Sequence, residues 1–492
     1  MILGSSVAGI DSTVVAVALP AIGRNLHVGF QGLQWTVTSY TLTLASLILL
    51  AGSLSDRWGR RRVFLAGLSW FTLASVLCAV SPGIGWLVAA RAVQGVGGAL
   101  MTPASLAIIE AAFRPDDRVH AIGTWAGFCG VSAAIAPFVG GWLLEAGSWR
   151  LIFLINVPVA AVTAWATLRH VPESRDTSPS GSADWPGALA GVTALASITY
   201  AIIVLPGAGV TSPLFIAAAV LAVASSATFA VAERRGSHPM LPLTIFAPPQ
   251  FRAANTVTFV IYGALGGFAF VFIPALEIVA GYSPVVAGSA LVPVTAVTLL
   301  LSGTSGRLAQ RTGPRPLVVA GCLMCAAAAG LAARVGSHAG YWTVVFPLAL
   351  LFGLGLASLV PPLTAAAMTS APDWMAGLAS GVNNAVSRVA GLLWIAALPP
   401  ITGLTGAAYV HPERFRSSFG DISWICAAAF ACAAVIAAAF ITRPSPTPAL
   451  RTALAQTPVP HLTCPVACLV EDAVGERAGA RVPEAGRAAD ES

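Results

Sequence analysis

The sequence predicts an all-α polytopic membrane protein of fourteen transmembrane helices, arranged as two six-helix halves with two additional central helices between them. Three observations predict this fold class. Mean hydropathy is +0.81, with 57% hydrophobic and 9% charged residues, which is more apolar than a water-exposed surface allows. Apolar stretches of about 20 residues, long enough to cross ~30 Å of hydrocarbon, recur almost from end to end. Finally, an early segment is repeated later at a constant offset.

The apolar stretches show no two-residue alternation, so they are expected to be helices and not barrel strands. The expected spans are 2–22, 35–55, 63–81, 85–107, 121–143, 151–168, 186–206, 212–232, 254–280, 284–304, 316–334, 342–366, 376–400 and 421–441. Polar linkers flank the seventh and eighth spans, and the end of the chain is rich in Pro and Ala, which favours disorder. The predicted domains are an N-terminal half (1–170), a linker with two inserted helices (171–251), a C-terminal half (252–441) and a disordered cytoplasmic tail (442–492).

The repeat relates the two halves. A shift of 254 residues aligns GSLSDRWGRRR (52–62) with GRLAQRTGPRP (306–316) and Pro20 with Pro274, although Gln310 replaces Asp56. Alternating-access transporters use such duplicated six-helix units, with the substrate site between them near the bilayer midplane.

Charge placement predicts the orientation. All 26 basic residues are arginine, and the fourteen that fall in loops on one side outnumber the five on the other. The positive-inside bias then places both termini in the cytoplasm. The basic pI reflects this topology and gives no indication of a nucleic-acid partner.

Five motifs lie in order on these spans. GSLSDRWGRRR resembles the signature loop of the major facilitator superfamily, RAVQGVGGAL (91–100) its span-4 motif, and SAAIAPFVGG (132–141) the antiporter motif of its exporters. Together with IDSTVVAVALP (10–20) and WRLIFLINVP (149–158), residues 1–441 resemble the fourteen-span drug:proton antiporter branch.

The resemblance implies the major facilitator fold and proton-coupled efflux of drugs, antibiotics or other amphipathic organic compounds by alternating access. It implies no cofactor other than the proton as coupling ion. The expected partners are a small amphipathic organic substrate and the lipid bilayer, and the chain is expected to act as a monomer in a bacterial plasma membrane. The sequence departs from the family pattern at Ser132 and Ala136, where glycines are usual, and at Glu277, where glutamine is usual.

The charged loop has two interpretations. Gly52 and Gly59 would allow close backbone approach where spans 2 and 3 turn, and Asp56 would face a helix N-terminus or an arginine. The loop is either a latch that closes the cytoplasmic gate in one state or a simple topology anchor. The residues expected to form it are Gly52, Asp56, Arg57, Gly59, Arg60 and Arg61.

Charged residues within the spans are the candidates for proton coupling and for the substrate cavity. Arg91 is expected to face a wet cavity and to pair with carbonyls or an acid, since a lipid-facing arginine is costly; snorkelling to the outer surface is the alternative. Asp11 lies at the midplane, either as a proton-exchanging group or as a packing residue. Arg388 and Asn384 share a polar face of span 13, which either lines the substrate path or joins helices. Glu277 is either a coupling group or a surface carboxylate.

Span 5 carries small residues and a proline at Ser132, Ala136, Pro137, Gly140 and Gly141. This pattern predicts a close, bendable contact between the halves.

The chain lacks nucleophile–base sets, metal-ligand spacings and a phosphate-binding loop, which disfavours an enzyme or an ATP-driven pump. Two alternatives to efflux remain open, a facilitator or importer of a small solute and a non-transporting membrane sensor.

Overall fold

The computed structural model describes residues 2–112, 125, 128, 131–132, 135–175, 184–236, 241–337, 339–370, 375–405 and 411–442. Contacts divide the chain into Met1–Pro444 and Ser445–Ser492. Of the predicted tail (442–492), only Thr442 is among the described residues. Within the described part, every regular element is a helix.

The N-terminal half contains the helices α1 (Ile2–Leu26), α2 (Phe30–Trp58), α3 (Arg60–Ala79), α4 (Ile84–Ala112), α6 (Leu151–Leu154) and α7 (Asn156–His170). The inserted pair is α8 (Trp185–Ala208) and α9 (Pro213–Arg235). The C-terminal half contains η1 (Leu243–Phe246), α10 (Pro249–Ile278), α11 (Pro284–Ser289), α12 (Leu291–Thr312), α13 (Pro314–Ala332), η2 (Tyr341–Val345), α14 (Phe346–Met368), α15 (Ala376–Ile401) and α16 (Pro412–Phe440).

Thirteen helical stretches among the described residues are long and apolar enough to cross a membrane. They match thirteen of the fourteen expected spans. Much of the remaining one, 121–143, falls outside the described residues, and its described part is the helical segment Ile135–Glu145. The protein is therefore a multi-pass membrane protein with an all-helical fold, in agreement with the prediction.

The repeat is visible in the backbone. Gly59 separates α2 from α3 with φ +103°, and Gly313, its repeat partner, separates α12 from α13 with φ +88°. Residues that carry a side chain rarely adopt such φ values, so both junctions favour glycine. The repeat-related Pro20 and Pro274 line one small gap between α1 and α10. The related helices thus face each other across the boundary between the halves.

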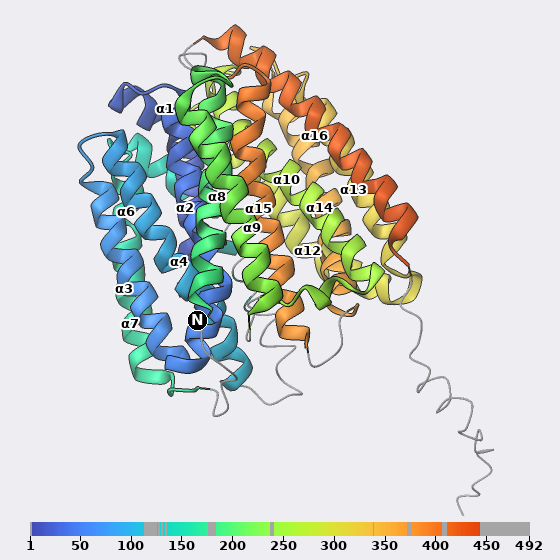
Figure 1. Cartoon of the computed structure of the whole chain (residues 1–492). Coiled ribbons are helices and arrows are strands. Elements are labelled where there is room, and N and C mark those ends of the chain that lie inside the picture. The colour runs from blue at the N-terminus through green and yellow to red at the C-terminus, as the bar shows by residue number, and fades with distance from the viewer. Residues whose placement is uncertain are drawn as a thin grey trace, which may run out of the picture. The chain divides into compact units, whose positions relative to one another are not determined.

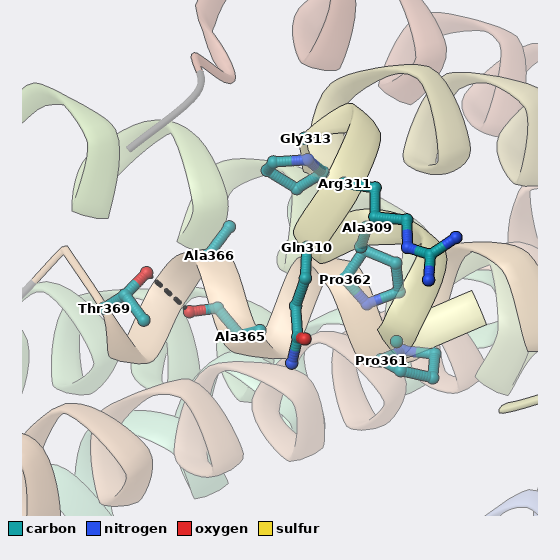
Figure 2. Close-up of a pocket in the computed structure, with 11 residues that line it drawn as sticks. Ala309, Gln310, Arg311, Gly313, Pro361, Pro362, Ala365, Ala366 and Thr369 are labelled. Atoms are coloured by element: carbon teal, nitrogen blue, oxygen red, sulfur yellow. Dashed lines mark hydrogen bonds between the residues drawn. The ribbon is translucent and has the colours of Figure 1, made fainter. Parts of the chain in front are cut away.

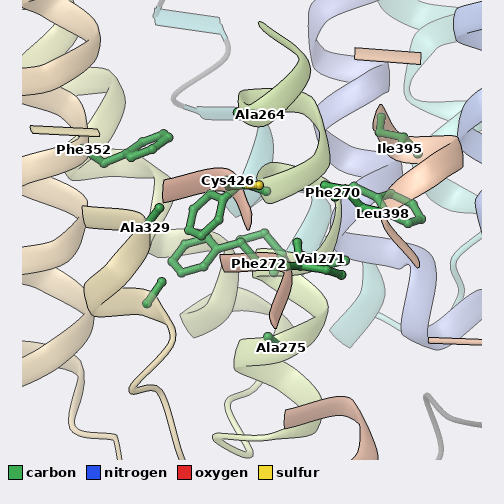
Figure 3. Close-up of a cluster of buried hydrophobic side chains, with 14 of the residues drawn as sticks. Ala264, Phe270, Val271, Phe272, Ala275, Ala329, Phe352, Ile395, Leu398 and Cys426 are labelled. Carbon is green, nitrogen blue, oxygen red and sulfur yellow. The ribbon is translucent and has the colours of Figure 1, made fainter. Parts of the chain in front are cut away.

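The largest apolar cluster fills the C-terminal half and continues into α1 and α2. Figure 3 shows part of it, where Phe270 and Phe272 of α10 lie near Leu398 of α15 and Cys426 of α16. Cys322 and Cys325 of α13 are buried in the same cluster and form no disulfide bond.

The inserted helices lie against both halves. α8 packs on α9 and also contacts α2 and α15 (Figure 1). Gln31 of α2 donates a hydrogen bond to the carbonyl of Ile203 in α8 at 3.1 Å. α9 is mostly exposed, as a helix facing lipid would be.

The two ends of the helical bundle differ. We call the end with Gly59 and Gly313 the gate-loop end, and the opposite end the far end. At the far end the halves are joined directly, because the Gln34 amide donates to the carbonyls of Ile395 and Ala396 at 2.7 and 2.8 Å. Phe30 adds an edge contact with Phe270, with ring centroids 5.5 Å apart. The described residues therefore hold the halves together at the far end.

Candidate functional site: a buried charge network and its surroundings

A charged pair lies in the interior of the N-terminal half. Asp11 of α1 and Arg91 of α4 form an ion pair and are each 1% exposed. Their charges are removed from both water and lipid, so the surrounding residues must supply polar partners.

Three polar side chains complete this network. Gln94 lies one turn after Arg91 on the same face of α4, and its amide nitrogen donates to Asp11 Oδ1 at 2.9 Å. Asn156, the first residue of α7, donates to the same oxygen at 3.0 Å. Ser75 of α3 accepts hydrogen bonds from both amides, at 2.8 and 3.2 Å. Asp11 thus receives three donors from two helices, an arrangement suited to the ionised carboxylate.

Arg91 also has contacts that do not involve Asp11. Its Nε donates to the carbonyl of Thr36 in α2 at 3.2 Å, and its Nη1 donates to Gln94 Oε1 at 2.6 Å. The guanidinium lies 4.3 Å from the centre of the Tyr40 ring, a cation–π distance. Arg91 would therefore keep several partners if Asp11 no longer paired with it.

The expectation that Arg91 faces a wet cavity is wrong, because the side chain is buried. Snorkelling is excluded by the same burial. The expected acid and carbonyl partners are present, as Asp11 and Thr36. Enclosure by five helices replaces hydration, which the sequence of α4 alone could not reveal.

Sequence reasoning missed Gln94, Asn156, Ser75 and Tyr40. Gln94 lies inside the quoted span-4 motif and Asn156 inside the quoted span-6 motif. Their positions among apolar residues on motif-bearing helices were the available signal. Ser75 and Tyr40 carried no comparable signal.

Arg388 and Asn384 do lie together on α15. Arg388 Nε donates to Asn384 Oδ1 at 3.0 Å, and Asn384 is exposed while Arg388 is partly exposed. Among the described residues no carboxylate lies within 4 Å of Arg388. The side chain is within electrostatic range of Tyr40 and Tyr262, and Tyr40 is also the ring that the Arg91 guanidinium covers.

Asn383, the residue before Asn384, points into the C-terminal half instead. It donates to Asn255 at 3.2 Å and to Thr258 at 3.0 Å, both on α10. These bonds join α10 and α15. The polar residues of α15 therefore lie on two faces, one packed against α10 and one, with Asn384 and Arg388, that is at least partly exposed.

Glu277 lies in the last turn of α10 and is partly buried. One of its carboxylate oxygens is buried without a hydrogen-bond partner in the described part of the chain, and Arg24 is the charge that influences it most. Glu277 is not among the described partners of Asp11, so no hydrogen bond or ion pair places it in the same network.

The gate loop is anchored within its own half. Asp56 pairs with Arg60 at 3.1 Å, and Arg60 donates to the carbonyl of Ala107 in α4 at 3.2 Å. Glu173, which was not predicted, accepts the backbone N–H groups of Arg61 and Arg62 at 3.0 and 3.2 Å. A carboxylate at these positions satisfies free amides at the start of α3.

Other loop residues are less constrained than expected. Arg61 also donates to the carbonyl of Leu168 at 3.1 Å, whereas Arg57 is partly exposed. The expected close approach at Gly52 is wrong, because Gly52 lies inside α2 and a Cβ there would be 3.8 Å from Pro103, an ordinary contact. Only Gly59 forms the turn.

The second copy of the loop borders a groove. A cavity of about 510 Å³ lies between α12, α13 and α14, and Figure 2 shows Gln310 and Arg311 near Pro361 and Pro362. Pro314 occupies the position that Arg60 has in the first copy. The C-terminal half therefore lacks both Asp56 and Arg60, the pair that ties the first loop to α4.

The glycines of span 5 make the close contacts that were expected. A Cβ on Gly140 would lie 2.9 Å from a Val14 side-chain carbon, and one on Gly141 would lie 2.7 Å from the Cα of Val285 in α11. Ala136 is buried, the carbonyl of Pro137 lies against Gly288, and Ser132 is hydrogen-bonded to Ser6 at 2.9 Å. The segment thus packs against both halves.

Comparison with known proteins decides the family. Residues 1–395 match the Major Facilitator Superfamily. The chain belongs to this superfamily. It is a membrane transporter by family, and not an enzyme.

Three similar proteins are resistance or export proteins. The chain is 34% identical over 416 residues to the multidrug resistance protein Stp of Mycobacterium tuberculosis, covering 84% of this chain and 77% of Stp. It is 34% identical to the tetracenomycin C resistance and export protein of Streptomyces glaucescens, covering 80% and 73%. It is also 34% identical to the methylenomycin A resistance protein of Streptomyces coelicolor, covering 80% and 83%.

Solved structures agree on the fold. A bacterial homologue of the lysosomal transporter Spinster, in an inward-facing conformation, matches with a TM-score of 0.62 at 16% identity, covering 89% of this chain and 94% of that one. The peptide transporter POT in complex with sulfate matches with a TM-score of 0.64 at 16% identity, with the same coverage.

Proposed function

We propose that this transporter exports drugs, antibiotics or other amphipathic organic compounds across a bacterial plasma membrane in exchange for protons. The observation that carries the proposal is the similarity, over four-fifths of the chain, to resistance and export proteins that handle chemically different compounds. The antiporter-like segment 132–141 supports export over the importer and facilitator alternatives.

In this proposal the gate-loop end is cytoplasmic, as the arginine distribution predicts. The far end is closed by contacts between the halves through Gln34 and Gly141. The ion pair between Asp56 and Arg60 and the hydrogen bond of Arg60 to Ala107 lie within the N-terminal half. This combination supports an inward-facing state in which the latch is released.

Proton coupling is assigned to Asp11. In the present state its carboxylate is occluded and fully paired, so proton exchange belongs to a different conformation. A proton on Asp11 would cancel its attraction for Arg91, which would retain Thr36, Gln94 and Tyr40 as partners. These three partners thus allow the ion pair to separate without leaving the Arg91 guanidinium unpartnered.

Movement of Arg91 would reach the C-terminal half through Tyr40. Arg388 lies within electrostatic range of the same tyrosine. Arg388 and Asn384 retain exposure and are the candidates for contact with substrate. The polar pair suits oxygen-bearing groups of an amphipathic compound, such as carbonyl oxygens.

A susceptibility screen tests the function. The full chain is expressed in a pump-deficient bacterial host and challenged with amphipathic antibiotics and dyes, with an Arg388→Gln, Asn384→Ala variant at matched membrane abundance as the control. The proposal expects raised inhibitory concentrations for several compounds with the wild type and not with the variant. Unchanged susceptibility across the panel at confirmed expression would contradict efflux, and increased sensitivity would favour an importer.

A further inference from the structure

A separate cavity lies where the inserted helices meet both halves. It has a volume of about 330 Å³ and is bounded by α2, α8, α9, α10 and α15. Its walls are almost entirely apolar, with Leu49, Gly191, Leu195, Phe229 and Val386 among them. This volume lies at the lower end of the ~300–1,000 Å³ typical of small-molecule sites.

One acidic side chain lines this apolar space. Glu233 of α9 is 4% exposed, and its Oε2 accepts the backbone N–H of Leu241 at 2.8 Å. Its Oε1 is buried and has no hydrogen-bond partner in the part of the chain that the structure describes. A buried acceptor with no donor is costly, so the site is incomplete as it stands.

Within the described ranges, no arginine or histidine forms an ion pair with this carboxylate. Among the described residues none lies within 4 Å of Glu233, and the adjacent Arg234 and Arg235 are exposed. Asp184, the N-cap of α8, adds a second acidic group within electrostatic range, and its Oδ2 is also buried without a partner. The negative field and the free acceptors exclude anions from this cavity.

We propose that this cavity binds small amphiphilic cations, with a protonated amine donating to Glu233 Oε1 and an apolar body lying between Phe229, Leu195 and Val386. The protonated amine supplies the positive charge and the N–H donor that the carboxylate lacks. The apolar body of the ligand packs against the apolar walls. The cavity is lined by the inserted helices as well as by both halves, and a binding site there goes beyond the proposed export itself.

The surroundings indicate a route from the bilayer. Exposed apolar side chains cover the outer faces of both inserted helices, among them Leu189, Leu214, Val220 and Val223. A compound dissolved in the bilayer could reach the cavity along α8 and α9, which carry these side chains and line it. The inserted pair therefore forms a lateral binding site for compounds that partition into lipid.

Binding of dansylcadaverine, a fluorescent primary amine, tests the proposal with the purified full chain in nanodiscs of phosphatidylcholine and phosphatidylglycerol. Glu233→Gln should weaken binding by roughly tenfold or more, the loss expected for one charge-assisted hydrogen bond of about 1.5–3 kcal/mol. The glutamine oxygen still accepts the Leu241 N–H, so the local fold is preserved. The N-acetylated probe, which has no ammonium, should bind weakly and equally to both proteins.

Two further variants control the result. Gly191→Leu, whose Cβ would be 3.4 Å from Phe229, fills the cavity and should also weaken binding. Asp421→Asn changes an exposed acid of α16 and should have no effect. Equal affinity of wild type and Glu233→Gln for dansylcadaverine would overturn the proposal.

Lipid is the other source of an ammonium group. Phosphatidylethanolamine added to the nanodiscs should leave probe binding unchanged; displacement of the probe would overturn the assignment to small molecules in favour of a lipid headgroup. Because the measurement uses no gradient, it is independent of transport. Loss of export with intact Glu233-dependent binding would refute only the proposed function, and the reverse would refute only this site.

Discussion

Replacing Asp11 with asparagine should destabilise the protein more than replacing an exposed acid with its uncharged amide. The change keeps the shape and retains one oxygen for Gln94 and Asn156. It turns the partner of Arg91 Nη1 from a carboxylate oxygen into an amide nitrogen, so two donors face each other. Arg91 then stays buried without a counter-charge.

Removing one partner of a buried ion pair costs about 3–5 kcal/mol, because the remaining charge is uncompensated. Pairing with the Thr36 carbonyl and the Tyr40 ring places the expected loss for Asp11→Asn near the lower end, about 3 kcal/mol. Arg91→Gln should lose a similar amount. The double variant removes both charges, so its loss should fall short of the sum by about 2 kcal/mol or more, within the range known for contacting residues.

Unfolding in mixed micelles with increasing dodecyl sulfate, followed by tryptophan fluorescence, measures these free energies. Asp421→Asn is the matched exposed control and should change stability by less than about 0.5 kcal/mol. Additivity of the two single losses to within about 0.5 kcal/mol would refute the network as described, because it would show that the charges do not depend on each other.

The remaining predictions concern glycines. Gly59→Ala should lower the free energy of unfolding by about 1–3 kcal/mol, because Gly59 has a positive φ and a Cβ there would lie 2.6 Å from Glu173. Gly52→Ala should be nearly neutral, because its Cβ would make only an ordinary contact. Equal losses for the two variants in the same unfolding assay would contradict the turn assignment. Gly141→Val should separate the halves at the far end and abolish efflux of a dye from intact cells, whereas Gly207→Ala, which has open space around it, should not; normal efflux by Gly141→Val would show that far-end closure is dispensable.

Much of the fold could be predicted from the sequence because each span is long, apolar and bounded by polar turns. The repeat was readable for a physical reason as well. Gly59 and Gly313 occupy backbone conformations that only glycine adopts readily, so both positions keep the residue while Asp56 and Gln310 diverge.

The site was less predictable because burial depends on several helices at once. Arg91 was recognised as costly in a membrane, yet its sequence neighbours could not show that Asp11, Thr36 and Tyr40 enclose it. Glu233 was missed because it immediately precedes two arginines at the end of a span, where a charge is ordinary. Its isolation follows from the packing of α8 on α9.

Transport by everted vesicles tests the central claim, proton-coupled export through Asp11, most directly. Vesicles energised to an acidic interior should accumulate a cationic dye, added dye should release protons from the interior, and a protonophore should abolish both signals. Asp11→Asn should lose gradient-driven accumulation and retain at most slow downhill exchange. Undiminished proton-coupled uptake by Asp11→Asn would contradict the assignment of the coupling site and make Glu277 the next residue to change. Wild-type uptake that is insensitive to the protonophore would contradict antiport itself.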